Sequence, residues 1–140
     1  MKIVVGYVKS PEGRAALEWA IGEARRSGAG LVVVHSLRGG GSMASEEEEI
    51  LTYRPELDSI EKRLDDLGIG HSTRRLIRGM SPADDLIRVA AEEGAELIVI
   101  GIRRRSRTGK LIMGSNSQEI LLNAECPVVA VKADYLPESD

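Results

Sequence analysis

The sequence predicts an α/β protein built on a three-layer open sheet of five parallel strands, and two observations carry this prediction. Short apolar runs alternate with longer segments of helical periodicity along the whole chain. Several of these runs are almost continuous Val, Ile and Leu, which is typical of strands that are buried on both faces. Because crossovers between parallel strands are right-handed, we expect about four helices on the two faces and the strand order 3-2-1-4-5.

The elements follow from the apolar runs and from the residues that bound them. Strands are expected at Lys2–Tyr7, Leu31–Ser36, about 72–78, Glu96–Gly101 and Pro127–Lys132. Helices are expected at Pro11–Ser27, about Glu46–Leu67, Pro82–Glu93 and Ser115–Asn123. The start signals are two serines before prolines, and the stop signals are three glycines: Ser10, Ser81, Gly28, Gly68 and Gly94.

Length and composition limit the classes of protein to which the chain belongs. A chain of 140 residues predicts a single domain, 1–133, with a short acidic tail, 134–140. The net charge of −3 argues against a general nucleic-acid or anionic-membrane surface. The single cysteine, Cys126, excludes an internal disulfide, and no apolar run approaches the ~20 residues of a membrane span. We therefore expect a cytoplasmic protein without membrane or nucleic-acid partners.

The segment 101–115 is the strongest candidate for a ligand-binding loop. It follows an apolar run and precedes an expected helix, where glycines at 101, 109 and 114 let the backbone approach a bound group. The hydroxyl of Ser115 and the free N–H groups of the helix N-terminus favour an anion. In the expected topology this loop faces Tyr7–Ser10 across the crevice where the strand order reverses. A solvated basic loop is the alternative, since residues 103, 104, 105 and 107 are arginines and 110 is lysine.

The glycine-lysine pair in this candidate loop does not form a Walker A phosphate-binding loop (P-loop). Gly109-Lys110 is followed by Leu111, whereas a Walker A loop needs Ser or Thr at that position.

The segment Arg38–Ser45, with three consecutive glycines, is the most flexible piece of the expected fold. One hypothesis makes it a flap over the site.

The remaining reactive side chains are interpreted as structural. Two histidines and one cysteine are too few and too scattered for a zinc site, so no metal site is expected. His35 is interpreted as a structural histidine on the second strand, His71 as a turn residue, and Cys126 as a small buried packing residue. The pairs Asp65-Asp66 and Asp84-Asp85 are interpreted as solvated helix faces, because adjacent helical positions point about 100° apart. No catalytic residue is assigned, and the chain is not expected to be an enzyme.

Four segments carry a resemblance to a known family. They are the opening KIVVGYVKSPEGRAALEWA, the second strand VVVHSL, the segment GMSPADDLIRVAAEEGAELIVIG and the closing GSNSQEILLNAECPVVAVK. From Lys2 to Lys132 the chain resembles the universal stress protein family. The resemblance implies the adenine nucleotide α-hydrolase-like form of the Rossmann-like fold, a role in the stress response, and ATP or another adenine nucleotide, with magnesium, as ligand.

The nucleotide-binding members resemble one another in a pattern of glycine, two residues, glycine, nine residues, glycine and then serine or threonine. Gly101, Gly114 and Ser115 keep this spacing, but Arg104 stands at the second glycine. Val8 stands where ATP-binding members carry aspartate, and Lys9 where glycine is common. The nucleotide-binding residues implied by the resemblance are Tyr7, Val8, Ser36, Gly101, Arg103, Arg104, Gly114, Ser115, Asn116 and Ser117.

The two departures leave several functions open. Arginine at 104 offers its guanidinium to a phosphate in place of backbone recognition, whereas Val8 offers no acceptor. The site is thus a degenerate adenine-nucleotide site or a site for another phosphorylated metabolite. The alternative is a dimeric interaction module that binds no nucleotide. Slow ATP hydrolysis is a third hypothesis, for which the sequence offers no general base near the phosphates.

The last strand predicts a homodimer. Pro127–Val131 is apolar and lies at one edge of the expected sheet, where its unpaired backbone groups invite another strand. Pairing with the same strand of a second copy gives a closed two-fold dimer, and the resemblance implies the same contact. The alternative is that the tail Ala133–Asp140, with three acidic residues, protects the edge.

Overall fold

Strands and helices alternate along the chain in the computed structural model, which describes residues 1–37, 43–77, 81–102 and 114–134. The strands are β1 (Lys2–Gly6), β2 (Gly30–Leu37), β3 (His71–Ile77), β4 (Leu97–Ile102) and β5 (Val128–Lys132). The helices are α1 (Pro11–Ser27), α2 (Met43–Asp66), α3 (Pro82–Glu93) and α4 (Ser115–Asn123). All neighbouring strands are parallel, in the order β3-β2-β1-β4-β5. The predicted fold class and strand order are confirmed.

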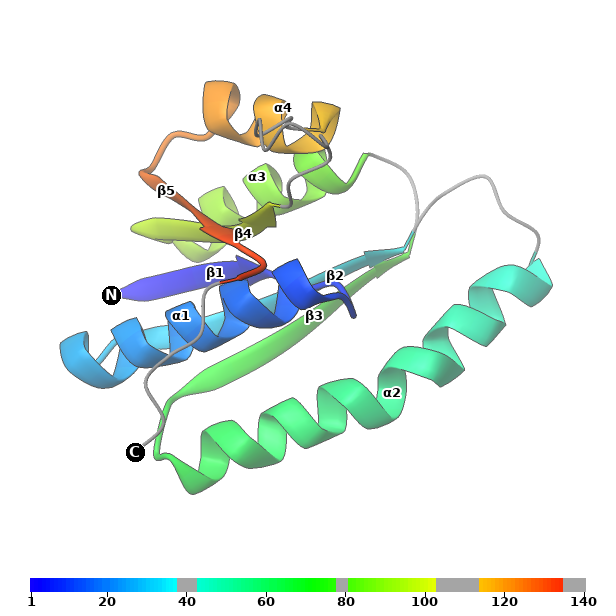
Figure 1. Cartoon of the computed structure of the whole chain (residues 1–140), viewed down its shortest axis with the longest axis horizontal. Coiled ribbons are helices and arrows are strands. Elements are labelled where there is room, and N and C mark those ends of the chain that lie inside the picture. Colours follow the sequence, from blue (N-terminus) through cyan, green and yellow to red (C-terminus); the bar gives the residue numbers. More distant parts are fainter. Residues whose placement is uncertain (38–42, 78–80, 103–113, 135–140) are drawn as a thin grey trace.

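The sheet is the middle layer of three. Figure 1 shows α1 and α2 on one side of the sheet and α3 and α4 on the other. Alternate residues of β1 supply both cores: Ile3 and Val5 pack with α1 and α2, whereas Val4 packs with α3 and α4. All three side chains are fully buried. Burial on both faces explains why the strands read as nearly continuous apolar runs.

The ends of α1 and α3 lie where the sequence predicts them. Ser10 Oγ accepts a hydrogen bond from Gly13 N at 3.1 Å, and Ser81 Oγ accepts one from Asp84 N at 3.2 Å. Gly28 and Gly94 end α1 and α3 with φ of 77° and 64°, which is left-handed backbone that favours glycine. The two serine caps fix the direction in which the chain enters α1 and α3, and therefore the positions of the loops that precede these helices.

Several predicted boundaries differ from the observed ones by one to three residues, and the starts of α2 and β3 are examples. α2 begins at Met43 instead of Glu46, so it enters the segment expected to be flexible; residues 38–42 lie outside the described residues, and the flap hypothesis stays untested. β3 begins at His71, which pairs with Leu31 and is not a turn residue. The reversal before β3 is tight, because Gly68 adopts a φ of 71° and Ile69 N already bonds Leu64 O at 2.9 Å.

Within the described residues, no helix combines the length and apolar character needed to cross a membrane. Residues 135–140 of the predicted acidic tail lie outside the described part of the chain.

Candidate functional site

A pocket of about 470 Å³ opens at the carboxyl ends of the central strands, where the strand order reverses between β1 and β4. Its wall combines the ends of β1, β2 and β4 with the first turns of α1, α3 and α4 and one face of α2. The volume lies within the range of roughly 300–1,000 Å³ that is typical of small-molecule sites. We call it the β1/β4 pocket. Its position agrees with the crevice predicted from the topology.

The end of β1 contributes an apolar floor. Tyr7 is 2% exposed, packs in the core beneath α1 and α2, and donates a hydrogen bond from its hydroxyl to the Glu56 carboxylate. Burial raises the pKa of the Tyr7 phenol well above its ordinary value, and the contact with Glu56 acts in the same direction. Tyr7 therefore lines the pocket without a free polar group. Val8, which is 55% exposed, adds an apolar side chain to the wall.

Gly101 lies in the pocket wall, but packing already accounts for the glycine. A Cβ at Gly101 would lie 2.1 Å from the Glu12 carbonyl oxygen, because β4 ends directly against the first turn of α1. The sequence pattern predicts that this glycine serves the approach of a ligand. The contact between β4 and α1 requires glycine here by itself, and the predicted ligand role stays a prediction.

The first turn of α4 lies at one end of the pocket and begins without a side-chain cap. Gly114 is the N-cap residue and supplies no side-chain cap, and a Cβ there would meet nothing within 4 Å. Asn116 and Ser117 line the pocket, whereas Ser115 is exposed and lies outside the lining. Uncapped N–H groups and the positive end of the helix dipole favour a phosphate here. Arg103 and Arg104 lie outside the described residues, so their predicted contacts stay predictions.

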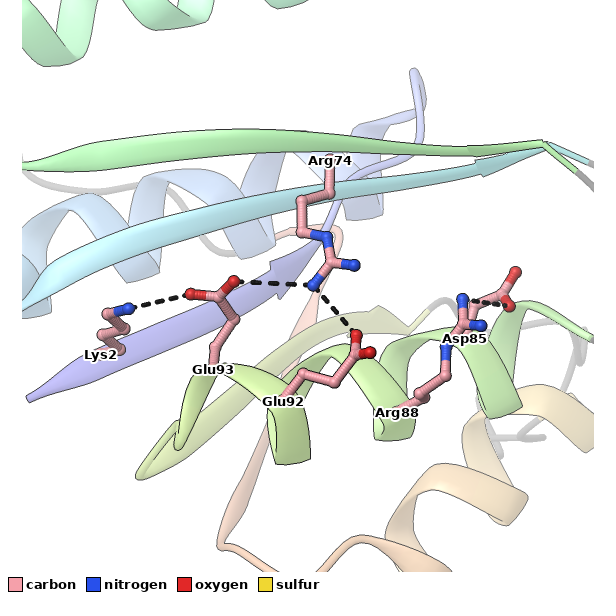
Figure 2. Close-up of polar contacts among 6 residues, drawn as sticks. All are labelled: Lys2, Arg74, Asp85, Arg88, Glu92 and Glu93. Atoms are coloured by element: carbon pink, nitrogen blue, oxygen red, sulfur yellow. Dashed lines mark hydrogen bonds and ion pairs between the residues drawn. The ribbon is translucent and has the colours of Figure 1, made fainter.

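Ser36 lines the pocket with its hydroxyl already committed. Its Oγ donates to Asp85 Oδ2 at 2.5 Å. Figure 2 shows the second contact of this carboxylate, in which Arg88 Nη2 lies 3.4 Å from Asp85 Oδ1. Asp85 is 1% exposed, so the interpretation of Asp84-Asp85 as a solvated face is wrong for Asp85. The 100° step between adjacent helical positions turns Asp85 toward the sheet while Asp84 stays half-buried at the rim. The hydroxyl of Ser36 therefore already has a hydrogen-bond partner on α3.

His35 and α2 close the other end of the pocket. The His35 ring is 4% exposed and stacks on Tyr53, with ring centroids 3.7 Å apart and 21° between the planes. Burial lowers the pKa of the imidazole. The hydroxyl of Tyr53 accepts a hydrogen bond from Lys9 N at 3.0 Å, which joins α2 to the loop after β1. His35 thus has the buried environment expected of a structural histidine, and it also lies in the pocket wall.

Sequence patterns did not predict several of the pocket residues, among them Glu12, Glu49 and Tyr53. Glu49 and Tyr53 are four residues apart, so they share one face of α2. The sequence predicts that these two side chains share a face of the helix. It does not predict that this face lies over the end of β2.

The other reactive groups take no part in this site. Cys126 is partly buried against the core beneath α3 and α4, and burial raises the pKa of its thiol. His71 is the first residue of β3 and is not among the residues that line the pocket. Its Nε2 lies 2.7 Å from Asp65 Oδ1. Among the described residues, no three side chains of His, Cys, Asp or Glu converge as a metal site would require.

Comparison with known proteins gives consistent matches over nearly the whole chain. The model of the universal stress protein family matches residues 1–132. A universal stress protein of Mycolicibacterium smegmatis is 38% identical over 130 residues, covering 93% of this chain and 96% of the relative. A solved universal stress protein of Archaeoglobus fulgidus is 40% identical, with a TM-score of 0.79 and coverage of 94% of this chain and 98% of that one. Another from the same organism, solved in complex with dAMP, is 33% identical, with a TM-score of 0.73 and the same two coverages. With this match of sequence and of strand order, the chain belongs to the universal stress protein family.

Proposed function

We propose that this protein is a cytoplasmic regulatory module of the stress response that holds an adenine nucleotide in the β1/β4 pocket. The observation that carries the proposal is the uncapped first turn of α4 at one end of a pocket of about 470 Å³. The relative from Archaeoglobus fulgidus that was solved with dAMP supports the choice of an adenine nucleotide. Holding the nucleotide requires no reaction, so the proposed role is binding and not catalysis.

The polarity of the pocket orients the nucleotide. The phosphate is placed at the N–H groups around Gly114, Asn116 and Ser117, where the helix dipole favours negative charge. The base is placed at the opposite end, between the end of β2 and Tyr53 of α2. The sugar then passes over Val8, which offers no acceptor to its hydroxyl groups.

The same observation at Val8 favours the second candidate function. An apolar side chain that is 55% exposed at the mouth of the pocket suits a protein contact better than a sugar contact. In this candidate the protein binds no nucleotide and acts as a dimeric interaction module. Val8→Asp separates the two: binding that appears only in this variant favours the interaction module, and equally tight binding by both proteins favours the nucleotide module.

The direct test is a thermal-shift titration with AMP, dAMP, ADP, ATP and cyclic AMP, each with and without magnesium. A ligand at 100 times its dissociation constant stabilises the native state by about 2.7 kcal/mol, which raises Tm by several degrees. We expect a shift with adenine nucleotides and none with adenosine at the same concentration, because adenosine lacks the phosphate. Absence of any shift at millimolar nucleotide contradicts the proposal.

Gly114→Asp tests where the phosphate binds. Gly114 has a φ of −69°, and a Cβ at this position would meet open space, so the fold accepts aspartate. The new carboxylate caps α4 and occupies the anion site, so we expect Tm of the free protein to hold or rise while the nucleotide-induced shift disappears. Gly114→Ser is the matched control, since it caps the helix without adding negative charge. Nucleotide binding that survives Gly114→Asp would place the phosphate elsewhere.

A further inference from the structure

Two hydrogen-bond acceptors face each other at the base end of the β1/β4 pocket, and none of the described residues places a donor between them. His35 Nε2 is buried and has no hydrogen-bond partner among the described residues. Glu49 Oε2 lies 3.7 Å from it, beyond hydrogen-bonding distance. Both residues line the pocket, and the Glu49 side chain is 34% exposed. A buried ring nitrogen that no described residue pairs is costly, so we assign its missing donor to a ligand in the pocket.

The tautomer of His35 follows from its other nitrogen. His35 Nδ1 lies 3.3 Å from the carbonyl oxygen of Tyr7, and a carbonyl only accepts, so Nδ1 carries the hydrogen. The stacked ring of Tyr53 holds the imidazole plane in place. A neutral imidazole with its hydrogen on Nδ1 has only a lone pair at Nε2. Nε2 therefore acts as an acceptor.

The surroundings keep this imidazole neutral at neutral pH. Burial lowers the pKa of His35, and the charge of Arg75 on β3 acts in the same direction. The Tyr7 carbonyl and the carboxylate of Glu49 on α2, through both its charge and its polar contact with the ring, act against this shift without reversing it. Tyr53 on α2 faces the ring through its aromatic surface. The pocket consequently presents two acceptors, a neutral ring nitrogen and a carboxylate.

A group with two hydrogens on one nitrogen satisfies both acceptors. The exocyclic 6-amino group of adenine is such a group, and it lies at the rim of the base, opposite the sugar. A 6-oxo purine, such as hypoxanthine or guanine, would bring a third acceptor to the same place. Glu49 lies on the exposed side of the pair, so its side chain has room to adjust to the amino group.

We propose that His35 Nε2 and the Glu49 carboxylate read the 6-amino group of the bound purine and thereby select adenine over 6-oxo purines. This inference rests on the proposed nucleotide function and names the residues that determine its base specificity. It assigns His35 a recognition role in addition to its packing role.

The test compares the dissociation constants of AMP and IMP, which differ in the group at position 6 and in the hydrogen that IMP carries on the adjacent N1. We expect the wild-type protein to bind AMP roughly tenfold or more tightly than IMP, because IMP leaves the buried acceptors unpaired. Glu49→Gln replaces one acceptor with an amide that also donates, so the preference should fall mainly through tighter binding of IMP. Glu48→Gln, an exposed neighbour on α2, is the matched control and should leave the ratio unchanged.

Two readouts separate the ways in which the inference fails. Equal affinities for AMP and IMP in the wild-type protein would overturn the base-reading role while the nucleotide function stands. No binding of either nucleotide would overturn both. Nitrogen-15 NMR of the free protein gives a check that needs no ligand: we expect the His35 hydrogen on Nδ1, and a hydrogen on Nε2 would overturn the inference.

Discussion

At the residue scale, Gly13 allows the first turn of α1 to pack closely against the backbone of the loop after β1. A Cβ at Gly13 would lie 1.8 Å from the Val8 carbonyl oxygen, a distance that real structures do not tolerate. We expect Gly13→Ala to lower the free energy of unfolding by roughly 1–3 kcal/mol, because backbone atoms must shift to admit the methyl group. Urea denaturation measures the change.

Gly22, in the same helix, is the matched control for that substitution. A Cβ at Gly22 would meet only the flexible end of Arg26, at 3.5 Å. Gly22→Ala should therefore raise the free energy of unfolding by about 0.5–1 kcal/mol, the usual gain when alanine replaces glycine inside a helix. Equal effects at the two positions would show that α1 does not pack against the loop as described.

Individual residues also show where the sequence alone was insufficient. The spacing of Gly101 and Gly114 predicts a ligand loop, and Gly101 does lie in the pocket wall, but the spacing does not reveal that Gly101 avoids a clash with Glu12. Ser36 was expected to contact a ligand, yet its hydroxyl bonds the buried Asp85. Both contacts join segments that are far apart in the chain, and hydrophobic periodicity carries no information about such pairs.

At the scale of elements, ion pairs join the C-terminal turn of α3 to two strands. Glu93 Oε1 lies 2.9 Å from Lys2 Nζ of β1, and Glu93 Oε2 lies 3.6 Å from Arg74 Nη1 of β3, as Figure 2 shows. Arg74 also contacts Glu92 Oε1 at 3.1 Å. The cluster orients α3, whose first turn forms part of the pocket wall.

The contribution of Glu93 should depend on pH in a defined direction. The hydrogen bond from Lys2, together with the charges of Lys2 and Arg74, lowers the pKa of Glu93 from its ordinary value of 4.5. A carboxyl with a lowered folded-state pKa stabilises the native state above its unfolded pKa and loses that contribution as pH falls through the folded pKa. Glu93→Gln should therefore reduce stability at pH 7, and the difference from wild type should shrink progressively below about pH 4.5.

Thermal unfolding across pH, with the exposed Glu96→Gln as control, measures this difference. The effect should also weaken in high salt, because Lys2 is half exposed. A difference that stays constant from pH 7 to pH 3 would contradict a role for the Glu93 charge.

Helix α2 shows why element boundaries were harder to predict than element types. Leu57, Ile60 and Leu64 recur at helical spacing and are buried, so the existence of the helix could be predicted. Pro55 lies inside it and does not end it, because the buried face outweighs the propensity cost of one proline. The start at Met43 has no sequence signal of comparable strength. The position of Tyr53 over the pocket depends on tertiary packing.

At the scale of the whole molecule, the alternation of elements was enough to predict the location of the site. Right-handed crossovers and one reversal of strand order leave a single crevice between β1 and β4, and the pocket opens there. The polar side chains of the pocket were harder to predict from the sequence. Glu49 enters it from α2, and no rule of strand order states where a long helix crosses the sheet edge.

The exposed edge of β5 supports the predicted homodimer and suggests a way to test it. Pro127 O accepts a hydrogen bond from Ile98 N at 3.0 Å, so Pro127 and the alternate residues Val129 and Val131 direct their backbone groups toward β4. Val128 and Ala130 consequently direct theirs away from the sheet, where a second copy would pair. The side chains of Val128, Val129 and Ala130 are only partly buried in the single chain.

We expect Ala130→Pro to abolish the dimer and preserve the fold, because proline removes an outward N–H without breaking the ladder to β4. Val129→Pro is the contrasting variant: it removes an inward donor and should destabilise the monomer itself. Analytical ultracentrifugation should give twice the chain mass for wild type and the chain mass for Ala130→Pro, with unchanged circular dichroism. If wild type is a monomer and a chain truncated after Ala133 dimerises, the acidic tail protects the edge instead. A dimer that survives Ala130→Pro would place the contact between copies on another surface.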